Sequence, residues 1–176
     1  MPTAIEAYFD DAGEQAVREL WSLLDRSGTQ SLGSVPGADY QPHVSFAVFN
    51  DGEVDAIASA VRAPAESLVG LPISLTAIGF FMTEEAPAFL AVIPSLRLVS
   101  AHRELVDAVR PVVRGFWPYY DVDALFPHCT LAMGVASRER TMDVLSGISL
   151  PIVTAVKAVR LVDVLTGRSV ARLAGT

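Results

Sequence analysis

The sequence predicts an α+β fold with two similar lobes, in which antiparallel-rich sheets with outer helices enclose a central cleft. Two observations lead to this prediction. Segments in which apolar residues recur with a period of 2, typical of strands, alternate along the chain with segments in which they recur with a period of 3.6, typical of helices. The order of these elements then repeats, with one His-x-Ser/Thr motif in each half. Because no low-complexity tract or long linker interrupts the pattern, we expect residues 1–176 to form a single domain.

The composition is that of an acidic chain with a large core. Its 176 residues are 51% hydrophobic, the mean hydropathy is +0.40, and the formal net charge is −7. This charge argues against a duplex-DNA-binding protein, because such proteins hold phosphates on positive surfaces. A single cysteine excludes a disulfide scaffold and fits a reducing compartment. We therefore expect a cytoplasmic monomer.

Neither a membrane span nor a secretion signal is predicted. The longest uncharged stretch, residues 67–83, contains Gly70, Pro72 and Gly79 and is typical of a buried strand rather than a bilayer helix. The first 11 residues are acidic, and they lack the basic start and apolar core of a secretory signal.

The first half of the chain begins with a strand and an amphipathic helix. Residues 3–9 have the strand pattern, and Asp11 with Glu14 three residues later has the spacing of a capping box that starts a helix. Gly28 is a suitable stop for this helix. The other elements expected in this half are a strand at 43–49, a helix capped by Asn50 or Asp51, and a strand at 71–81.

The second half repeats this order. Ser95 can cap a helix that we expect to end near Arg114, and Thr166-Gly167 forms the turn between the last two strands. The other elements expected are strands at 88–93, 127–133, 150–164 and 168–173 and a short helix at 137–145.

A five-residue motif occurs at 43–47 and again at 128–132, in both cases after a proline and before a helix. The two copies are 85 residues apart, and each helix leads to a Leu-Pro-Ile sequence. Since residues two apart share one face of a strand, each copy should present three side chains together to the cleft. These sets are His43, Ser45 and Ala47, and His128, Thr130 and Ala132, whereas Val44, Phe46, Val48, Cys129, Leu131 and Met133 should face the apolar side.

Two imidazoles and two hydroxyls suit the cleavage of a phosphodiester bond. One histidine can take a proton from the nucleophile while the other gives a proton to the leaving oxygen. Ser45 and Thr130 can donate hydrogen bonds to the non-bridging oxygens as negative charge builds up there. We therefore predict His43, His128, Ser45 and Thr130 as catalytic residues, with neither a metal nor a cofactor required. The sequence does not assign which histidine is the base.

With these motifs the chain resembles the two-histidine (2H) phosphoesterase superfamily, which includes 2′-5′ RNA ligase-like proteins and cyclic nucleotide phosphodiesterases. The resemblance implies metal-independent hydrolysis, or reversible ligation, of 2′,3′-cyclic phosphate or 2′,5′-linked nucleotides or RNA ends. Many RNA ligase-like members carry a basic residue soon after the second motif, where this chain has Met133 and Gly134. That difference and the acidic charge favour a short, mononucleotide-like cyclic phosphate, although a tRNA end or an ADP-ribose-type cyclic phosphate stays open.

Aromatic residues gather in the segments before the two motifs. The cluster comprises Tyr40, Trp117, Tyr119, Tyr120 and Phe126. Tyr40 and Phe126 are our preferred candidates for binding the substrate by stacking on a base. An equally good interpretation is that these rings cap the ends of the sheets.

The third histidine and two arginines have a structural and a functional interpretation. His102 falls on an apolar helical stripe and is expected in the core, the alternative being a zinc site with His43 and His128. Arg138 and Arg140 start a helix and could reach a phosphate, but exposed surface is the simpler expectation.

Two other classes of function stay open at this point. The chain could bind a nucleotide or phosphorylated metabolite on the same scaffold without turnover. It could instead be a structural interaction protein in which the histidines are incidental.

Overall fold

The computed structural model describes all 176 residues and confirms the α+β class. Three short 3-10 helices lie at Leu32–Ser34, Arg110–Val112 and Pro118–Tyr120. The strands and α-helices are β1 (Thr3–Phe9), α1 (Asp11–Arg26), β2 (His43–Gly52), α2 (Val54–Leu68), β3 (Pro72–Phe80), β4 (Ala88–Val92), α3 (Leu96–Val109), β5 (Val113–Phe116), β6 (His128–Ala132), α4 (Arg138–Leu145), β7 (Ile152–Asp163) and β8 (Ser169–Gly175).

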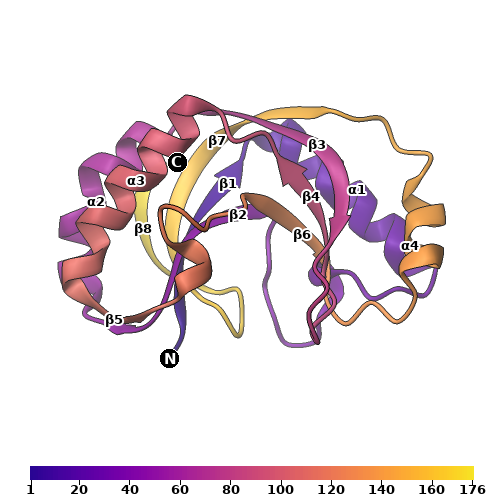
Figure 1. Cartoon of the computed structure of the whole chain (residues 1–176), viewed down its shortest axis with the longest axis horizontal. Coiled ribbons are helices and arrows are strands. Elements are labelled where there is room, and N and C mark those ends of the chain that lie inside the picture. The colour runs from indigo at the N-terminus through magenta and orange to yellow at the C-terminus, as the bar shows by residue number, and fades with distance from the viewer.

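The strands form one eight-stranded antiparallel sheet rather than two separate sheets. Its order is β5-β2-β1-β7-β3-β4-β6, and β8 also pairs with β7. Strand β7 joins the two halves, because residues 152–155 pair with β3 while residues 156–163 pair with β1. The sheet curves into an arch, and β2 and β6 come together beneath it (Figure 1).

The strand order agrees with the predicted duplication. If the first copy is β1, β2 and β3, and the second is β4, β6 and β7, the six strands read β2-β1-β7-β3-β4-β6. Each strand then has its counterpart at the mirrored place, and β5 and β8 are additions. The duplication itself stays a prediction.

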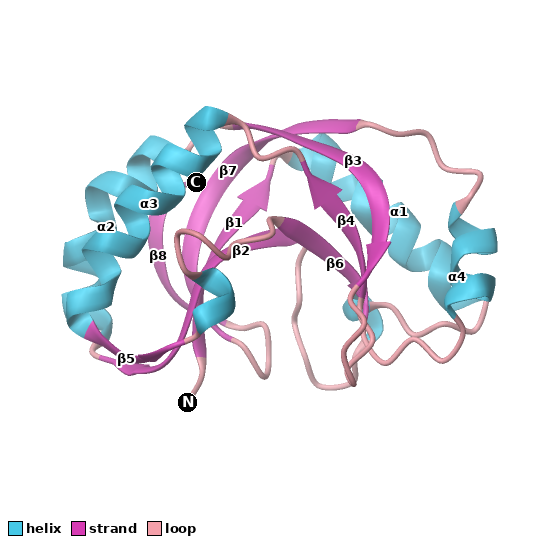
Figure 2. Ribbon diagram, viewed as in Figure 1, coloured by secondary structure: helices cyan, strands magenta, loops and turns pink.

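The helices lie on the outside of the arch in two pairs (Figure 2). Helices α2 and α3 pack together beside β8 and β2, and α1 and α4 pack together beside β3 and β6. Each pair therefore combines one helix from the first half of the chain with one from the second half. The core lies between these helices and the sheet; in α1, for example, the predicted stripe containing Val17, Leu20 and Leu24 is buried. None of the helices has the length and apolar character needed to cross a bilayer.

Several predicted helix boundaries are wrong. Helix α3 ends at Val109, well before Arg114, because Pro111 has no N–H with which to continue it. Arg114 instead lies in β5, opposite Asp51 of β2. Strand β2 continues to Gly52 and so includes Asn50 and Asp51, the two residues predicted to cap α2. The helix begins after them and has no side-chain cap.

Both motif strands contain a bulge at the same place, and this corrects the predicted faces. In β2, Ser45 pairs with Glu6 but Ala47 pairs with Ile5, so Phe46 is the extra residue. In β6, Thr130 and Ala132 pair with consecutive residues of β4, so Leu131 is the extra one. A bulge reverses the alternation beyond it. Consequently Ala47 and Ala132 join the core, and the side chains that continue along the cavity are Val48 and Met133.

Asp10 attaches the start of α1 to β7. It is the N-cap in place of the predicted Asp11, and its Oδ1 accepts hydrogen bonds from the Gly13 amide and the Thr154 hydroxyl, both at 2.9 Å. Its Oδ2 accepts from the Ala155 amide at 3.1 Å. These donors, the Gly13 amide foremost, hold the pKa of the carboxyl below its usual range. One carboxylate therefore fixes both the helix end and its position on the sheet.

We predict that Asp10→Ala lowers the free energy of unfolding by about 1–2 kcal/mol at pH 7, as expected for the loss of an N-cap. Because the pKa of the folded state lies below the unfolded value of about 3.9, this stabilisation is present above that pH and is lost as the pH falls through the folded value. Urea unfolding at several pH values measures both effects. Asp55→Ala, at an exposed position in the first turn of α2, is the control. Equal losses in the two variants would contradict this role for Asp10.

Candidate functional site

A cavity of about 440 Å³ is lined by both motif strands and by the loops before them. The structure brings all six predicted site residues to this one cavity, although they come from distant parts of the chain. They are His43, Ser45, His128, Thr130, Tyr40 and Phe126.

The two cavity histidines are held in the same way. Nδ1 of His43 lies 2.7 Å from the carbonyl oxygen of Gln41, and Nδ1 of His128 lies 2.7 Å from that of Phe126. A carbonyl oxygen only accepts hydrogen bonds, so Nδ1 is the donor in both rings. In each histidine, Nε2 is therefore the ring nitrogen that the backbone carbonyl leaves available.

A buried carboxylate lies next to His43. Glu6 is only 5% exposed, and its Oε1 is 3.3 Å from Nε2 of His43. Its other oxygen accepts a hydrogen bond of 2.5 Å from the Tyr8 hydroxyl. Burial and the Glu6 charge together raise the pKa of Tyr8, so that this hydroxyl stays protonated and remains a donor.

Aromatic rings surround His128. The ring centroids of Phe81 and Phe89 lie 4.9 Å and 5.2 Å from the imidazole, and the Phe126 ring lies at 6.5 Å. Burial among these rings lowers the pKa of His128 below its usual value, and the nearby His43 adds to this effect. His128 is therefore neutral at pH 7, with a lone pair on Nε2.

The motif hydroxyls follow the histidines along their strands. Ser45 is opposite Glu6 in the sheet, and Thr130 is opposite Phe89. Tyr120 lines the same cavity, and burial raises the pKa of its hydroxyl, which therefore stays protonated at pH 7. The lining thus contains several hydroxyl groups, those of Ser45, Thr130 and Tyr120 among them, but no lysine or arginine.

The two candidate stacking residues, Tyr40 and Phe126, differ in how firmly they are held and how accessible their rings are. The Tyr40 hydroxyl donates to the carbonyl oxygens of Val164 and Leu165, at 2.8 Å and 3.1 Å, so Tyr40 ties its loop to the turn between β7 and β8. Phe126 is half exposed, and its ring packs against Phe81 and Phe89. Phe126 therefore has an accessible surface that a base could contact. Of the other aromatic candidates, Trp117, Tyr119 and Tyr120 also line the cavity.

The third histidine and the two helical arginines lie away from the cavity. His102 is 2% exposed in α3, and its Nε2 hydrogen-bonds with the Tyr120 carbonyl at 3.1 Å. It thus supports a cavity residue from behind and does not line the cavity itself, and nowhere in the structure do three metal-ligating side chains converge. Arg138 and Arg140 are exposed on α4 and do not line the cavity.

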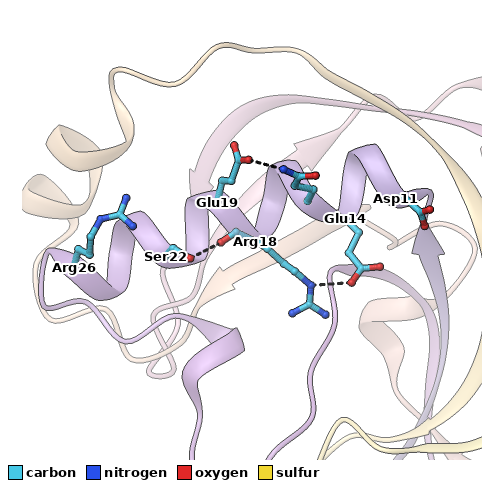
Figure 3. A pocket seen from close by; sticks show the side chains of 7 residues that line it. Asp11, Glu14, Arg18, Glu19, Ser22 and Arg26 are labelled. Atoms are coloured by element: carbon cyan, nitrogen blue, oxygen red, sulfur yellow. Dashed lines mark hydrogen bonds and ion pairs between the residues drawn. The ribbon is translucent and has the colours of Figure 1, made fainter.

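A second hollow runs along the outer surface of α1 and contains none of the predicted site residues (Figure 3). Several of its side chains bond to one another along the helix: Arg18 contacts Glu14 at 2.7 Å, and Gln15 donates to Glu19 at 3.1 Å. These are exposed contacts within one helix, so we assign no site to this hollow.

Sequence reasoning missed Glu6 and the two phenylalanines beside His128. Glu6 did leave a signal, because it is a single acidic residue within the otherwise uncharged strand β1. Its neighbours Ile5 and Ala7 face the core, so strand alternation directs Glu6 towards the cavity. Phe81 and Phe89 left no such signal, since only the pairing of β3, β4 and β6 brings them to the second motif.

Comparison with known proteins agrees with this arrangement. Over residues 9–168 the chain matches the family model described as the 2'-5' RNA ligase superfamily. No curated protein sequence matches the chain.

Solved structures have the same fold at low sequence identity. Escherichia coli LigT complexed with NADP+ has a TM-score of 0.55 and 12% identity over 92% of this chain and 87% of its own. LigT complexed with ATP has a TM-score of 0.54 and 12% identity, over 99% and 96%. Kluyveromyces marxianus Usb1 with uridine monophosphate has a TM-score of 0.51 and 14% identity, over 98% and 96%. With the family model covering most of its length, this chain belongs to the 2'-5' RNA ligase superfamily, the two-histidine phosphoesterases.

Proposed function

We propose that this protein is a metal-independent phosphodiesterase that opens 2′,3′-cyclic phosphates, or cleaves 2′,5′ linkages, of nucleotides or RNA ends. The observation that carries the proposal is the matched pair of histidines, each with Nδ1 bound to a carbonyl and Nε2 left for proton transfer, in one cavity with Ser45 and Thr130. Membership of a phosphoesterase superfamily supports it.

The reaction needs two protons to move and a negative charge to be stabilised. One histidine takes a proton from water as the water oxygen bonds to phosphorus, and the other donates a proton to the oxygen whose bond to phosphorus breaks. The hydroxyls of Ser45 and Thr130 donate hydrogen bonds to the non-bridging oxygens, whose charge grows in the transition state.

The cavity favours a small substrate with one phosphate. Its volume of about 440 Å³ is in the range of small-molecule sites, and its lining is mainly apolar and aromatic. The side chain of Phe126 offers a partly exposed ring for a base. Without a lysine or arginine in the lining, a chain of phosphates would find no cation, so we expect a cyclic mononucleotide or a single RNA end. The similar structures of LigT and Usb1 hold nucleotides: NADP+, ATP and uridine monophosphate.

We expect His43→Ala and His128→Ala each to lower kcat/KM for 2′,3′-cyclic mononucleotides by about 100- to 10,000-fold, since each removes one proton-transfer group. The assay follows all four cyclic nucleotides in the presence of a chelator. His102→Gln keeps a donor for the Tyr120 carbonyl and should retain activity. If the folded wild-type protein binds these nucleotides without turnover, the proposal fails in favour of the nucleotide-binding alternative.

Ser45→Ala and Thr130→Ala should each reduce kcat by about 10- to 1,000-fold, as expected when a donor to the transition state is lost. Circular dichroism checks that the strands are intact. Ser74→Ala on β3, which does not line the cavity, is the control. Unchanged rates in the Ser45→Ala and Thr130→Ala variants would show that these hydroxyls do not stabilise the transition state.

The rate should depend on pH in a bell-shaped way, and EDTA should leave it unchanged. A base that must be neutral and an acid that must be protonated produce the two limbs of the curve. Because the pKa of His128 is lowered by burial, one limb should lie on the acidic side of the usual histidine range. Loss of the rate in EDTA, with recovery on adding a divalent cation, would contradict a metal-independent mechanism.

A further inference from the structure

We propose that Glu6 is a positioning residue that keeps a proton on Nε2 of His43, which makes His43 the general acid and His128 the general base in hydrolysis. This inference rests on the proposed function for its catalytic meaning. Its physical content, the different protonation of two similarly held histidines, is independent of turnover.

Counting protons around His43 leads to this assignment. Nδ1 donates to the Gln41 carbonyl, and Nε2 faces Oε1 of Glu6 at 3.3 Å. A lone pair on Nε2 would face a carboxylate oxygen, which also carries only lone pairs, and this would be repulsive. A proton placed between the two atoms turns the repulsion into attraction, and with both groups buried that attraction is screened little by solvent.

Nothing comparable acts on His128. Its Nδ1 is also bound to a carbonyl, but its ring packs against Phe81, Phe89 and Phe126 rather than against a carboxylate. An imidazolium is costly among such rings, so Nε2 keeps its lone pair. The two histidines therefore differ in charge, although their strands and anchoring bonds match.

The assignment fixes the direction of proton flow. Nε2 of His128 takes a proton from water while the water oxygen forms its bond to phosphorus. The bond from phosphorus to the leaving oxygen breaks, and that oxygen takes the proton from Nε2 of His43. His43 ends the step neutral and His128 protonated, and exchange with solvent restores both.

Other groups near Glu6 act on the same charge. Tyr8 on the same strand donates to Oε2, and Arg160 of β7 lies 4.6 Å from the centre of the Tyr8 ring. Arg160 also donates to the Gln41 side chain at 3.2 Å. The other titratable groups whose charge is coupled to Glu6 are Tyr40 from the loop before β2, Tyr120 from the 3-10 helix and Cys129 from β6. These three are neutral at pH 7, so apart from His43 itself the main charge opposing Glu6 is the guanidinium of Arg160, the residue paired with Glu6 across the sheet.

The first test is a pH titration of the protein labelled with 15N-histidine, in which the ring nitrogen shifts report the protonation of each imidazole. Spectra of His102→Gln and His128→Ala assign the three signals. In the wild type, His43 should keep its second proton to a higher pH than His128, as expected when a buried carboxylate faces only one of the two imidazoles. Loss of both protons at the same pH, or of the His43 proton first, would overturn the inference.

The second test removes the charge and keeps the shape. Glu6→Gln removes the carboxylate that faces Nε2, so it should make His43 lose its second proton at lower pH than in the wild type, while His128 changes little. In the rate profile the high-pH limb, which reports the acid, should move in the same direction. Asp39→Asn, which neutralises an exposed carboxylate of the loop before β2, is the matched control and should move neither.

The two tests separate the inference from the proposed function. A wild-type protein without turnover would remove the phosphodiesterase proposal, while the nitrogen shifts would still show whether Glu6 holds the proton on His43. With turnover present, a Glu6→Gln variant that loses rate equally at every pH would show that Glu6 supports only the strand, and would overturn the inference.

Discussion

Strand β7 carries the hydrogen bonding of both halves of the sheet, and the position of the cavity depends on it. Its first four residues pair with β3, and the following residues pair with β1 on one edge and β8 on the other. Since neighbouring strands in a sheet twist relative to each other, a shared central strand sets the angle between the halves. That angle brings β2 and β6 together beneath the arch. The Asp10 carboxylate then attaches α1 to the same strand.

Within this sheet, the two motif histidines are held by matching backbone geometry but have different surroundings. Both histidines follow a proline, and both have Nδ1 bound to the carbonyl two residues earlier, so the local chain alone makes them equivalent. The difference comes from neighbouring segments: β1 brings a carboxylate to the first histidine, and β4 together with the residue that follows β3 brings phenyl rings to the second. On the proposal made above, this difference gives the cavity an acid side and a base side, which a directional proton transfer requires.

Features that depend on the local pattern of residues along the chain could be predicted from the sequence. The α+β class follows from the two hydrophobic periods, and the four motif residues lie at one cavity because their spacing repeats. The sequence was insufficient wherever pairing between distant strands decides the outcome. Bulges at Phe46 and Leu131 exist only relative to β1 and β4, so simple alternation placed Ala47 and Ala132 on the wrong face. The end of α3 was misjudged for a local reason, since the helical period hid the break at Pro111.

The matched bulges divide each motif strand into two parts that present different kinds of side chain to the cavity. Before the bulge the strand presents histidine and hydroxyl, and after it the strand presents Val48 or Met133 to the same cavity. A change at Val48 or Met133 reshapes the wall without moving the anchored imidazoles, because the bulge separates their hydrogen-bonding registers. If the proposed function holds, substrate preference can diverge among relatives, or be redesigned, one wall residue at a time, with both histidines left in place.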